Sequence, residues 1–200
     1  SLDDLADIAG LKSRVEVLTE KAMRGEIDFK IALKERVRLL KGQPETILRR
    51  FLSEKLKISD GAFSLVKTMK IQGAMAALVS GGFSQITEHV ANKVGFDINL
   101  GNQLLISDKK ITGEISTPIL NAQSKKKTLY SISNSQNVKI NDTIAVGDGA
   151  NDIPMLQSAG IGIAFRAKPI VQAATPFRVN HCDLTALLYI QGYNDSKIHK

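Results

Sequence analysis

Two carboxylates four residues apart, Asp148 and Asp152, belong to the run Gly147-Asp148-Gly149-Ala150-Asn151-Asp152. The apolar segment 143–146 before them predicts a buried strand, so both acids lie on the turn into the next helix. Ligands of open α/β sheets bind beyond the carboxyl ends of the strands, and hard oxygen donors beside a phosphate suit Mg²⁺. The alternative is structural: Asp152 caps the helix and Asp148 makes the turn. The complete run, with Asn151, favours ligand binding.

A second candidate is the segment 79–83, in which Ser80, Gly81 and Gly82 follow the apolar run 74–79. We expect that run to be a strand buried on both faces, with these three residues at the start of a helix. Backbone N–H groups and the helix dipole there attract phosphate, and the Ser80 hydroxyl adds one donor. The alternative is an ordinary strand-to-helix turn with Ser80 as N-cap, which the motif alone favours.

Two cations complete the candidate site. A lysine near a phosphate offsets the charge that develops during phosphoryl transfer, and Lys125 opens the tight basic run 125–127. Spacing alone separates Lys125 neither from its two neighbours nor from a surface lysine. Arg36 follows Phe29 by about two helical turns and borders an apolar stripe, where a guanidinium binds a carboxylate or phosphate. Its alternative is an edge position with the charged head in water.

The elements that position these residues change character near residue 58. Residues 1–57 show helical periodicity throughout, with Asp28 as an N-cap and Pro44 in the first turn of the last helix. Beyond them, strands expected at 74–79, 143–146 and 161–165 alternate with helices ending at Gly73 and Gly95, and a hairpin is expected around Asp108. This alternation predicts a parallel sheet with helices on both faces.

The composition excludes several classes of protein. A chain of 200 residues with 43% hydrophobic and 24% charged residues is globular rather than disordered. The net charge of +7 is spread along the chain, aromatic residues are 5%, and Trp is absent, so we expect no nucleic-acid partner. The apolar runs are too short to cross a membrane, so no membrane partner is expected. The single cysteine, Cys182, is expected to be buried and indicates a reducing compartment, hence the cytoplasm.

Together, these motifs resemble the haloacid dehalogenase-like phosphatases, and among them the members that act on phosphoserine. The resemblance covers essentially the whole chain. Its matching segments are Ala22–Gly25, Asp28-Phe29, Arg36-Val37, Leu39–Gly42, Val79–Phe83, Ala145–Asp152, Ala164-Phe165, Ala167–Pro169 and Asp183-Leu184. The resemblance implies an α/β fold: a three-layer, Rossmann-like parallel-sheet core over residues 58–200 and a small all-helical cap over residues 1–57.

The resemblance also implies a role for each candidate residue. Asp148 ligates Mg²⁺, Asp152 supports the metal site, Asn151 lies near the phosphate, and Lys125, now separated from its neighbours, stabilises it. Ser80, Gly81 and Gly82 bind the phosphate. The catalytic residues implied are therefore Ser80, Lys125, Asp148 and Asp152.

On the cap side, the resemblance implies that Met23, Phe29 and Arg36 line the substrate pocket, with Arg36 on the substrate carboxylate. The implied reaction is Mg²⁺-dependent hydrolysis of O-phospho-L-serine to L-serine and phosphate through an aspartyl-phosphate, the last step of serine biosynthesis. The partner implied is this small-molecule substrate, and a homodimer is compatible with the sequence.

One part of the family pattern is missing. The family's first motif, Asp-x-Asp-x-Thr, supplies the nucleophile and the general acid/base, and it does not occur in these 200 residues. Because Ser1–Asp4 resembles the start of the cap, we expect that motif, a glutamate that contacts substrate and the first central strand to lie upstream of a truncated sequence. Loss of that strand would leave two strand edges unpaired, and covalent transfer requires the missing carboxylate. Two alternatives remain: an inactive fragment or phosphate-binding module, and a related phosphatase for another small phosphomonoester.

Overall fold

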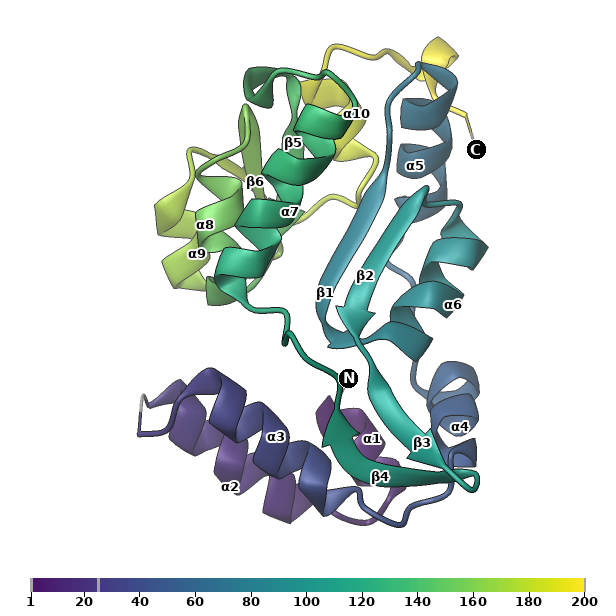
Figure 1. Cartoon of the computed structure of the whole chain (residues 1–200). Helices are drawn as coiled ribbons and strands as arrows, with labels where there is room; N and C mark the ends of the chain where they lie inside the picture. The colour runs from purple at the N-terminus through teal and green to yellow at the C-terminus, as the bar shows by residue number, and fades with distance from the viewer. Residues whose placement is uncertain (1, 25, 200) are drawn as a thin grey trace. The chain divides into compact units, whose positions relative to one another are not determined.

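The computed structural model describes residues 2–24 and 26–199, and of Met23 it describes the backbone (Figure 1). The chain forms two compact units, each with segments that are distant in sequence. The first unit comprises residues 1–58, 77–93 and 98–119, and the second comprises residues 59–76, 94–97 and 120–200.

The first unit combines helices, a pair of parallel strands and a hairpin. Its elements are α1 (Leu2–Ile8), α2 (Lys12–Met23), α3 (Phe29–Leu39), α4 (Thr46–Glu54), β1 (Ala77–Phe83), α6 (Ser84–Val94), β2 (Ile98–Asn102), β3 (Leu104–Ser107) and β4 (Lys110–Ile115). The apolar faces of these elements share one core, in which Leu5, Val37 and Phe51 from the helices meet Phe83 and Ile111 from the strands. Burial of these side chains stabilises helices that are too short to persist in isolation.

The helical predictions for the first unit hold with two corrections. Asp28 caps α3, since its carboxylate accepts hydrogen bonds from the N–H groups of Lys30 (2.8 Å) and Ile31 (3.3 Å). Phe29, expected in the apolar stripe, is 38% exposed, because it stands in the first turn of the helix. Pro44 lies before α4 rather than inside it: the segment around it pairs with Lys110, at the start of β4, as an isolated bridge.

The expected strand 74–79 is displaced. Strand β1 begins at Ala77 and continues through Ser80, Gly81 and Gly82 to Phe83, and most of it is half-buried rather than buried on both faces. Its parallel register with β2 shifts between Val79 and Phe83, which is the irregularity of a β-bulge. The helix α6 therefore starts at Ser84, beyond the residues expected to open it.

The second unit is built on the parallel sheet β5-β6-β7. Its elements are α5 (Ala62–Ile71), α7 (Ala122–Ser135), η1 (Ile140–Asp142), β5 (Ile144–Gly147), η2 (Ala150–Asp152), α8 (Ile153–Leu156), β6 (Ile161–Phe165), α9 (Pro169–Ala174), β7 (Phe177–Val179), α10 (Ala186–Ile190) and η3 (Asp195–Lys197).

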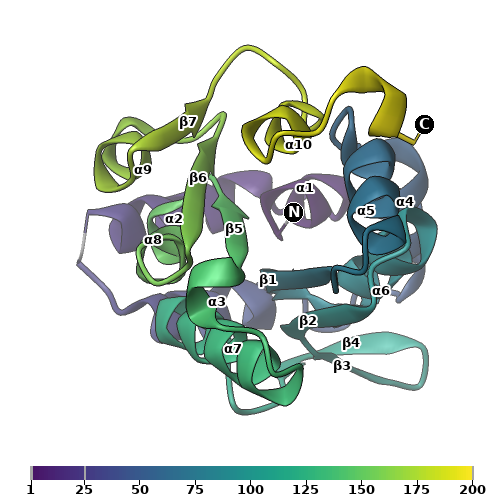
Figure 2. The same ribbon diagram turned by 90° about the horizontal axis from the view of Figure 1, so that it is seen from above.

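Helices cover both faces of this sheet, as predicted (Figure 2). Side chains of a strand alternate between faces, so Ile163 packs on the side of Leu187 in α10, while its neighbour Ala164 packs with Leu156 of α8 and Val171 of α9. The packing of α8 is close: a Cβ at Gly162 would lie 2.1 Å from the carbonyl oxygen of Leu156. The predicted strands 143–146 and 161–165 correspond to β5 and β6.

Most strands have a single neighbour. Within the described residues, every strand except β6 pairs with one other strand; β1 pairs only with β2, and β5 pairs only with β6.

Two further expectations concern the chain's surroundings. In the part of the chain that the structure describes, every helix is too short or too polar to cross a membrane. Cys182 is exposed, which corrects the expected burial: it follows β7 in a surface turn, where its carbonyl oxygen accepts a hydrogen bond from Arg166 (3.1 Å).

Candidate active site

The turn after β5 is closed by one carboxylate. The Oδ2 atom of Asp152 accepts hydrogen bonds from the backbone N–H groups of Asp148 (3.2 Å) and Gly149 (3.1 Å). Asp152 thus holds the backbone at the carboxyl end of β5 in a fixed loop. Asp152 therefore has the structural role that the sequence offered as an alternative, because it binds the turn that opens the next helix.

Asp152 also binds a buried cation. Its Oδ1 atom lies 2.5 Å from the Nζ atom of Lys125, and the two residues are 4% and 7% exposed. The side chain of Asn121 caps α7 by accepting from the N–H of Ser124 (3.0 Å). Lys125 lies in the first turn of this helix and is buried, whereas the following lysine is half-buried and the third is exposed. Burial therefore separates Lys125 from the rest of the basic run, which spacing did not.

Glycine is required at the end of β5. A Cβ atom at Gly147 would stand 2.5 Å from Cβ and 2.6 Å from Cγ of Asp152, distances that real Cβ contacts do not reach. The Asp152 side chain consequently passes directly over the Gly147 backbone to reach the turn. At Gly149 the nearest atom is the Oδ1 end of the Asn151 side chain, at 2.6 Å, which rotates away more readily.

A cavity of about 350 Å³ opens beside this turn. It lies at the carboxyl ends of β5 and β6 and is lined by Ser59, Val146, Gly147, Asp148, Phe165 and Arg166. Asp148 is exposed, and among the described residues its carboxylate has no hydrogen-bond or ion-pair partner. A free carboxylate beside a cavity at this edge of a parallel sheet is available to a ligand. The lining residue Arg166 holds a left-handed backbone (φ 44°), a conformation that recurs at functional sites.

The carboxylates at this turn fit a magnesium ion that also binds phosphate oxygens. Within the described residues no three His, Cys, Asp or Glu side chains form a metal-binding group. The Asp152 carboxylate is engaged by Lys125 and two N–H groups, so Asp148 is the free donor. Mg²⁺ commonly takes one or two carboxylates and keeps several waters together with phosphate oxygens, and one free carboxylate fits that mode.

The expected phosphate-binding segment lies in the first unit, and its backbone is partly engaged. The Ser80 hydroxyl oxygen accepts from the N–H of Gly82 (3.0 Å), and the Gly81 carbonyl accepts from the side chain of buried Asn102 (2.8 Å). These residues belong to the bulged part of β1, so the expected position at a helix start is wrong. The bulge itself was not foreseen, since nothing local in the sequence shows which strand pairs with this segment.

Arg36 is partly held by its surroundings in the first unit. Its Nε donates to the carbonyl oxygen of Ala32 (3.3 Å), and its Nη1 donates to the hydroxyl of Thr19 (3.2 Å). Burial lowers the pKa of Arg36, and the nearby carboxylate of Asp3 opposes this shift. Of the other cap-side candidates, Phe29 opens the same helix, whereas the side chain of Met23 lies outside the described residues.

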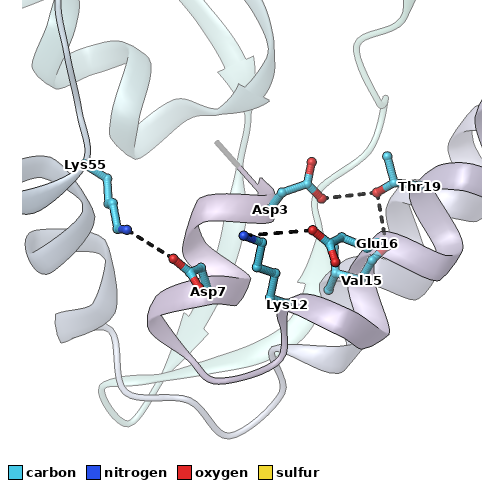
Figure 3. Close-up of polar contacts among 7 residues, drawn as sticks. All are labelled: Asp3, Asp7, Lys12, Val15, Glu16, Thr19 and Lys55. Atoms are coloured by element: carbon cyan, nitrogen blue, oxygen red, sulfur yellow. Dashed lines mark hydrogen bonds and ion pairs between the residues drawn. The ribbon is translucent and has the colours of Figure 1, made fainter.

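The sequence did not point to two residues near Arg36, namely Thr19 and Asp3. The Thr19 hydroxyl lies 3.1 Å from Asp3 Oδ1 and 3.1 Å from the carbonyl oxygen of Val15, as Figure 3 shows. Asp3 lies in the first turn of α1. One local signal was available: Thr19 follows buried Val15 by one turn and is a polar residue on the buried face of α2.

Known proteins resemble the chain as follows. Residues 4–157 match the model of the haloacid dehalogenase-like hydrolases. A phosphoserine phosphatase of Archaeoglobus fulgidus is 42% identical over 186 residues, which cover 93% of this chain and 54% of that protein. The crystal structure of a probable phosphoserine phosphatase from Vibrio cholerae, in unliganded form, has a TM-score of 0.89 at 36% identity and covers 96% of this chain.

A second solved structure is similar over nearly the whole of both chains. It is described as a phospho-aspartyl intermediate analogue of phosphoserine phosphatase, has a TM-score of 0.86 at 34% identity, and is covered to 90% by this chain. By contrast, the chain spans 54% of the Archaeoglobus protein and 59% of the Vibrio chain, a little more than half of each.

Proposed function

Because the chain belongs to the haloacid dehalogenase-like hydrolase family, we propose that it forms most of a phosphatase that hydrolyses O-phospho-L-serine to L-serine and phosphate. The relatives named phosphoserine phosphatase support the choice of substrate. The observation that carries the proposal is the unpartnered carboxylate of Asp148, held beside a cavity by the bonds of Asp152 to its turn.

Asp148 would hold Mg²⁺, which when bound supplies positive charge beside the transferred phosphoryl group. In this proposal, the N–H groups of Gly81 and Gly82 and the hydroxyl of Ser80 donate hydrogen bonds to phosphate oxygens. Asn151 adds a neutral amide donor. Binding would require the Gly82 N–H to exchange the Ser80 hydroxyl for the phosphate, at little net cost because one hydrogen bond replaces another.

Lys125 has three N–H donors, one of which binds Asp152. We assign the other two to the phosphate, where a fixed cation stabilises the charge that builds on the equatorial oxygens. Asp152 holds the Lys125 ammonium in place, and it keeps the Asp148 turn closed. Both roles follow from contacts of one carboxylate.

Arg36 would bind the serine carboxylate in this proposal, and Met23 and Phe29 would border the pocket. A guanidinium binds a carboxylate through two parallel N–H···O bonds. With the phosphate of the substrate held by the other residues, a monoester without a carboxylate would leave Arg36 without this partner. The cap in this proposal consists of residues 1–57 and the core of residues 58–200.

The nucleophile must come from outside these 200 residues, because Asp-x-Asp-x-Thr does not occur in them. We propose that an aspartate carboxylate attacks the phosphorus atom, the serine oxygen leaves and takes a proton, and water then hydrolyses the aspartyl-phosphate. The similar structure described as a phospho-aspartyl intermediate analogue supports this route. The proposal also places the enzyme in the cytoplasm with this small molecule as its partner, and a homodimer is compatible with it.

The test is phosphate release by the gene product that contains this chain, with Mg²⁺ and either O-phospho-L-serine or other small phosphomonoesters. We expect phosphoserine to be preferred and a chelator to abolish turnover. Rapid turnover of another monoester without release from phosphoserine would overturn the substrate assignment.

A second function, a module that binds phosphoserine without cleaving it, is favoured by the missing nucleophile motif alone. Calorimetry on the 200-residue chain separates the two. A cooperative melt that rises with phosphoserine, in a gene product that releases no phosphate, supports the binding module.

A further inference from the structure

The guanidinium of Arg36 is held through two of its nitrogens, Nε and Nη1. A guanidinium has five N–H donors in a rigid plane. The Nε donor binds the carbonyl oxygen of Ala32 at 3.3 Å, and one Nη1 donor binds Thr19 Oγ1 at 3.2 Å. Among the described residues, the remaining Nη1 donor and both Nη2 donors have no partner. One donor on Nη1 and one on Nη2 can bind a carboxylate through two parallel bonds.

Thr19 holds this arginine through an ordered hydroxyl. A hydroxyl has one proton, and when its oxygen accepts from Arg36 the proton is directed to another acceptor. Two acceptors are in reach, both at 3.1 Å: the carboxylate of Asp3 and the carbonyl of Val15 (Figure 3). Val15 and Thr19 are one turn apart on α2, whereas Asp3 comes from α1. The arginine, the threonine and the aspartate thus form a chain of contacts across three helices.

The position of Asp3 is itself fixed by packing. Its neighbours Leu2, Leu5 and Ala6 are buried in the core of the first unit. Asp7, one turn further along α1, forms an ion pair with Lys55 at 3.1 Å (Figure 3). The Asp3 carboxylate therefore stands on an anchored helix, and its charge is within electrostatic reach of Arg36.

Such a chain lowers the cost of binding a planar anion. Arg36 is half-buried, and a long side chain that is already ordered loses less conformational freedom when a ligand arrives. An unheld guanidinium would have to be oriented by the ligand itself.

We propose that Thr19 and Asp3 are positioning residues that orient Arg36 for the carboxylate of the substrate, and so set the selectivity for phosphomonoesters that carry one. This inference rests on the proposed phosphatase function. Neither residue is a catalytic residue, because each acts through Arg36. The alternative is a purely structural role, in which the pair only ties α1 to α2.

The experiment compares two substrates in the gene product that contains this chain. O-phospho-L-serine and O-phosphoethanolamine carry the same phosphate ester and ammonium group, and only the first has a carboxylate. We expect Thr19→Val, which keeps the shape and removes the hydroxyl, to reduce the ratio of the two kcat/KM values about tenfold, mainly through a higher KM for phosphoserine. Thr19→Ser restores the hydroxyl and is expected to restore the ratio.

Thr112→Val is the matched control. Thr112 is a half-buried threonine of the same unit, its hydroxyl donates to the carbonyl of Leu105 at 3.0 Å, and no arginine is bound to it in the described residues. We expect this variant to have the same ratio of kcat/KM values for the two substrates as the parent protein. As a second probe, Asp3→Asn keeps an oxygen acceptor for Thr19 and removes the charge that faces Arg36, and the ratio is expected to fall about threefold.

The outcomes separate this inference from the function on which it rests. If the parent protein releases phosphate from neither substrate, the proposed function is wrong. If the parent prefers phosphoserine but both substrates lose activity equally in Thr19→Val and Asp3→Asn, the two residues are structural and the positioning role is refuted. If Thr19→Val does not fold, Asp3→Asn alone decides in the same way.

Discussion

The ammonium of Lys125 and the carboxylate of Asp152 lie 2.5 Å apart, and both side chains are buried. Removal of one partner leaves the other charge in a site from which water is excluded. We expect Lys125→Met to lower the free energy of unfolding by about 3–5 kcal/mol, measured by urea denaturation of the gene product that contains this chain. Lys127→Met changes an exposed lysine of the same helix and should alter stability by less than about 0.5 kcal/mol.

The same pair can be tested for coupling. The double variant Lys125→Met, Asp152→Asn removes both charges, and the introduced amide would still offer an oxygen to the turn. Its loss of stability should be smaller than the sum of the two single losses by about 1–3 kcal/mol. Additive losses would mean that the two charges do not interact in solution.

The close passage of Asp152 over Gly147 leads to a second prediction. In Gly147→Ala the new Cβ would stand 2.5 Å from Asp152 Cβ, so the side chain or the strand must move. We expect a loss of about 1–3 kcal/mol in unfolding free energy together with a large loss of phosphatase activity. Gly149→Ala, which meets only the end of the Asn151 side chain at 2.6 Å, should be milder on both measures. Equal effects of the two variants would contradict the role given to Gly147.

Asp148 should behave in the opposite way, because it is exposed and its carboxylate has no hydrogen-bond or ion-pair partner among the described residues. Asp148→Asn is expected to change the free energy of unfolding by less than about 0.5 kcal/mol. Phosphate release should nevertheless fall about 100-fold or more, and the residual activity should no longer respond to added Mg²⁺. Retained magnesium dependence in this variant would place the metal ligand elsewhere.

The elements were predictable wherever local patterns decide the structure. Asp28 as an N-cap and the strands β5 and β6 follow from side-chain chemistry and apolar runs of a few residues. Strand β1 was misplaced because its extent depends on pairing with β2, about twenty residues further along, which the apolar run 74–79 does not encode. The strand β2 was missed for the same reason, since its segment 98–102 has little apolar character of its own.

The site shows the same division. The acidic turn was recognisable because its two carboxylates and glycines are adjacent in sequence. Lys125 could not be separated from its neighbours by spacing, since only the packing of α7 decides which lysine is buried. The contacts of Thr19 with Asp3 and Arg36 join residues 16 and 17 positions apart on three helices, and no local pattern reports a meeting of that kind.

Asp97 leads to a prediction about pH. The hydrogen bond from the N–H of Ala76 (2.9 Å), then the hydrogen bond and the charge of the Lys70 ammonium (2.7 Å), lower the pKa of Asp97. A carboxyl group whose pKa is lower in the folded state stabilises the fold above its unfolded pKa, near pH 4, and loses this effect as pH falls through the folded value.

Asp97→Asn should therefore lower the free energy of unfolding by about 0.5–1 kcal/mol at pH 7. The difference from the parent protein should shrink toward zero by about pH 2. Asp142→Asn, a change at an exposed aspartate of the same unit, serves as the control and should show no such trend. Urea denaturation over this pH range is the measurement. A difference that stays constant with pH would show that the charge of Asp97 is not responsible.

Arg36 itself is the last test, since the proposed substrate is distinguished by its carboxylate. Arg36→Ala should weaken transition-state binding of O-phospho-L-serine by about 2–5 kcal/mol. This loss corresponds to a fall in kcat/KM of roughly 30-fold to several thousand-fold. For O-phosphoethanolamine, which has no carboxylate for Arg36 to bind, we expect a change of about threefold or less. Arg36→Lys keeps the charge and loses the two parallel bonds. Its kcat/KM for phosphoserine should therefore lie between the values of the parent protein and of Arg36→Ala. Equal losses on both substrates would assign Arg36 to the fold or to the phosphate, and the substrate would then be a monoester selected by other means.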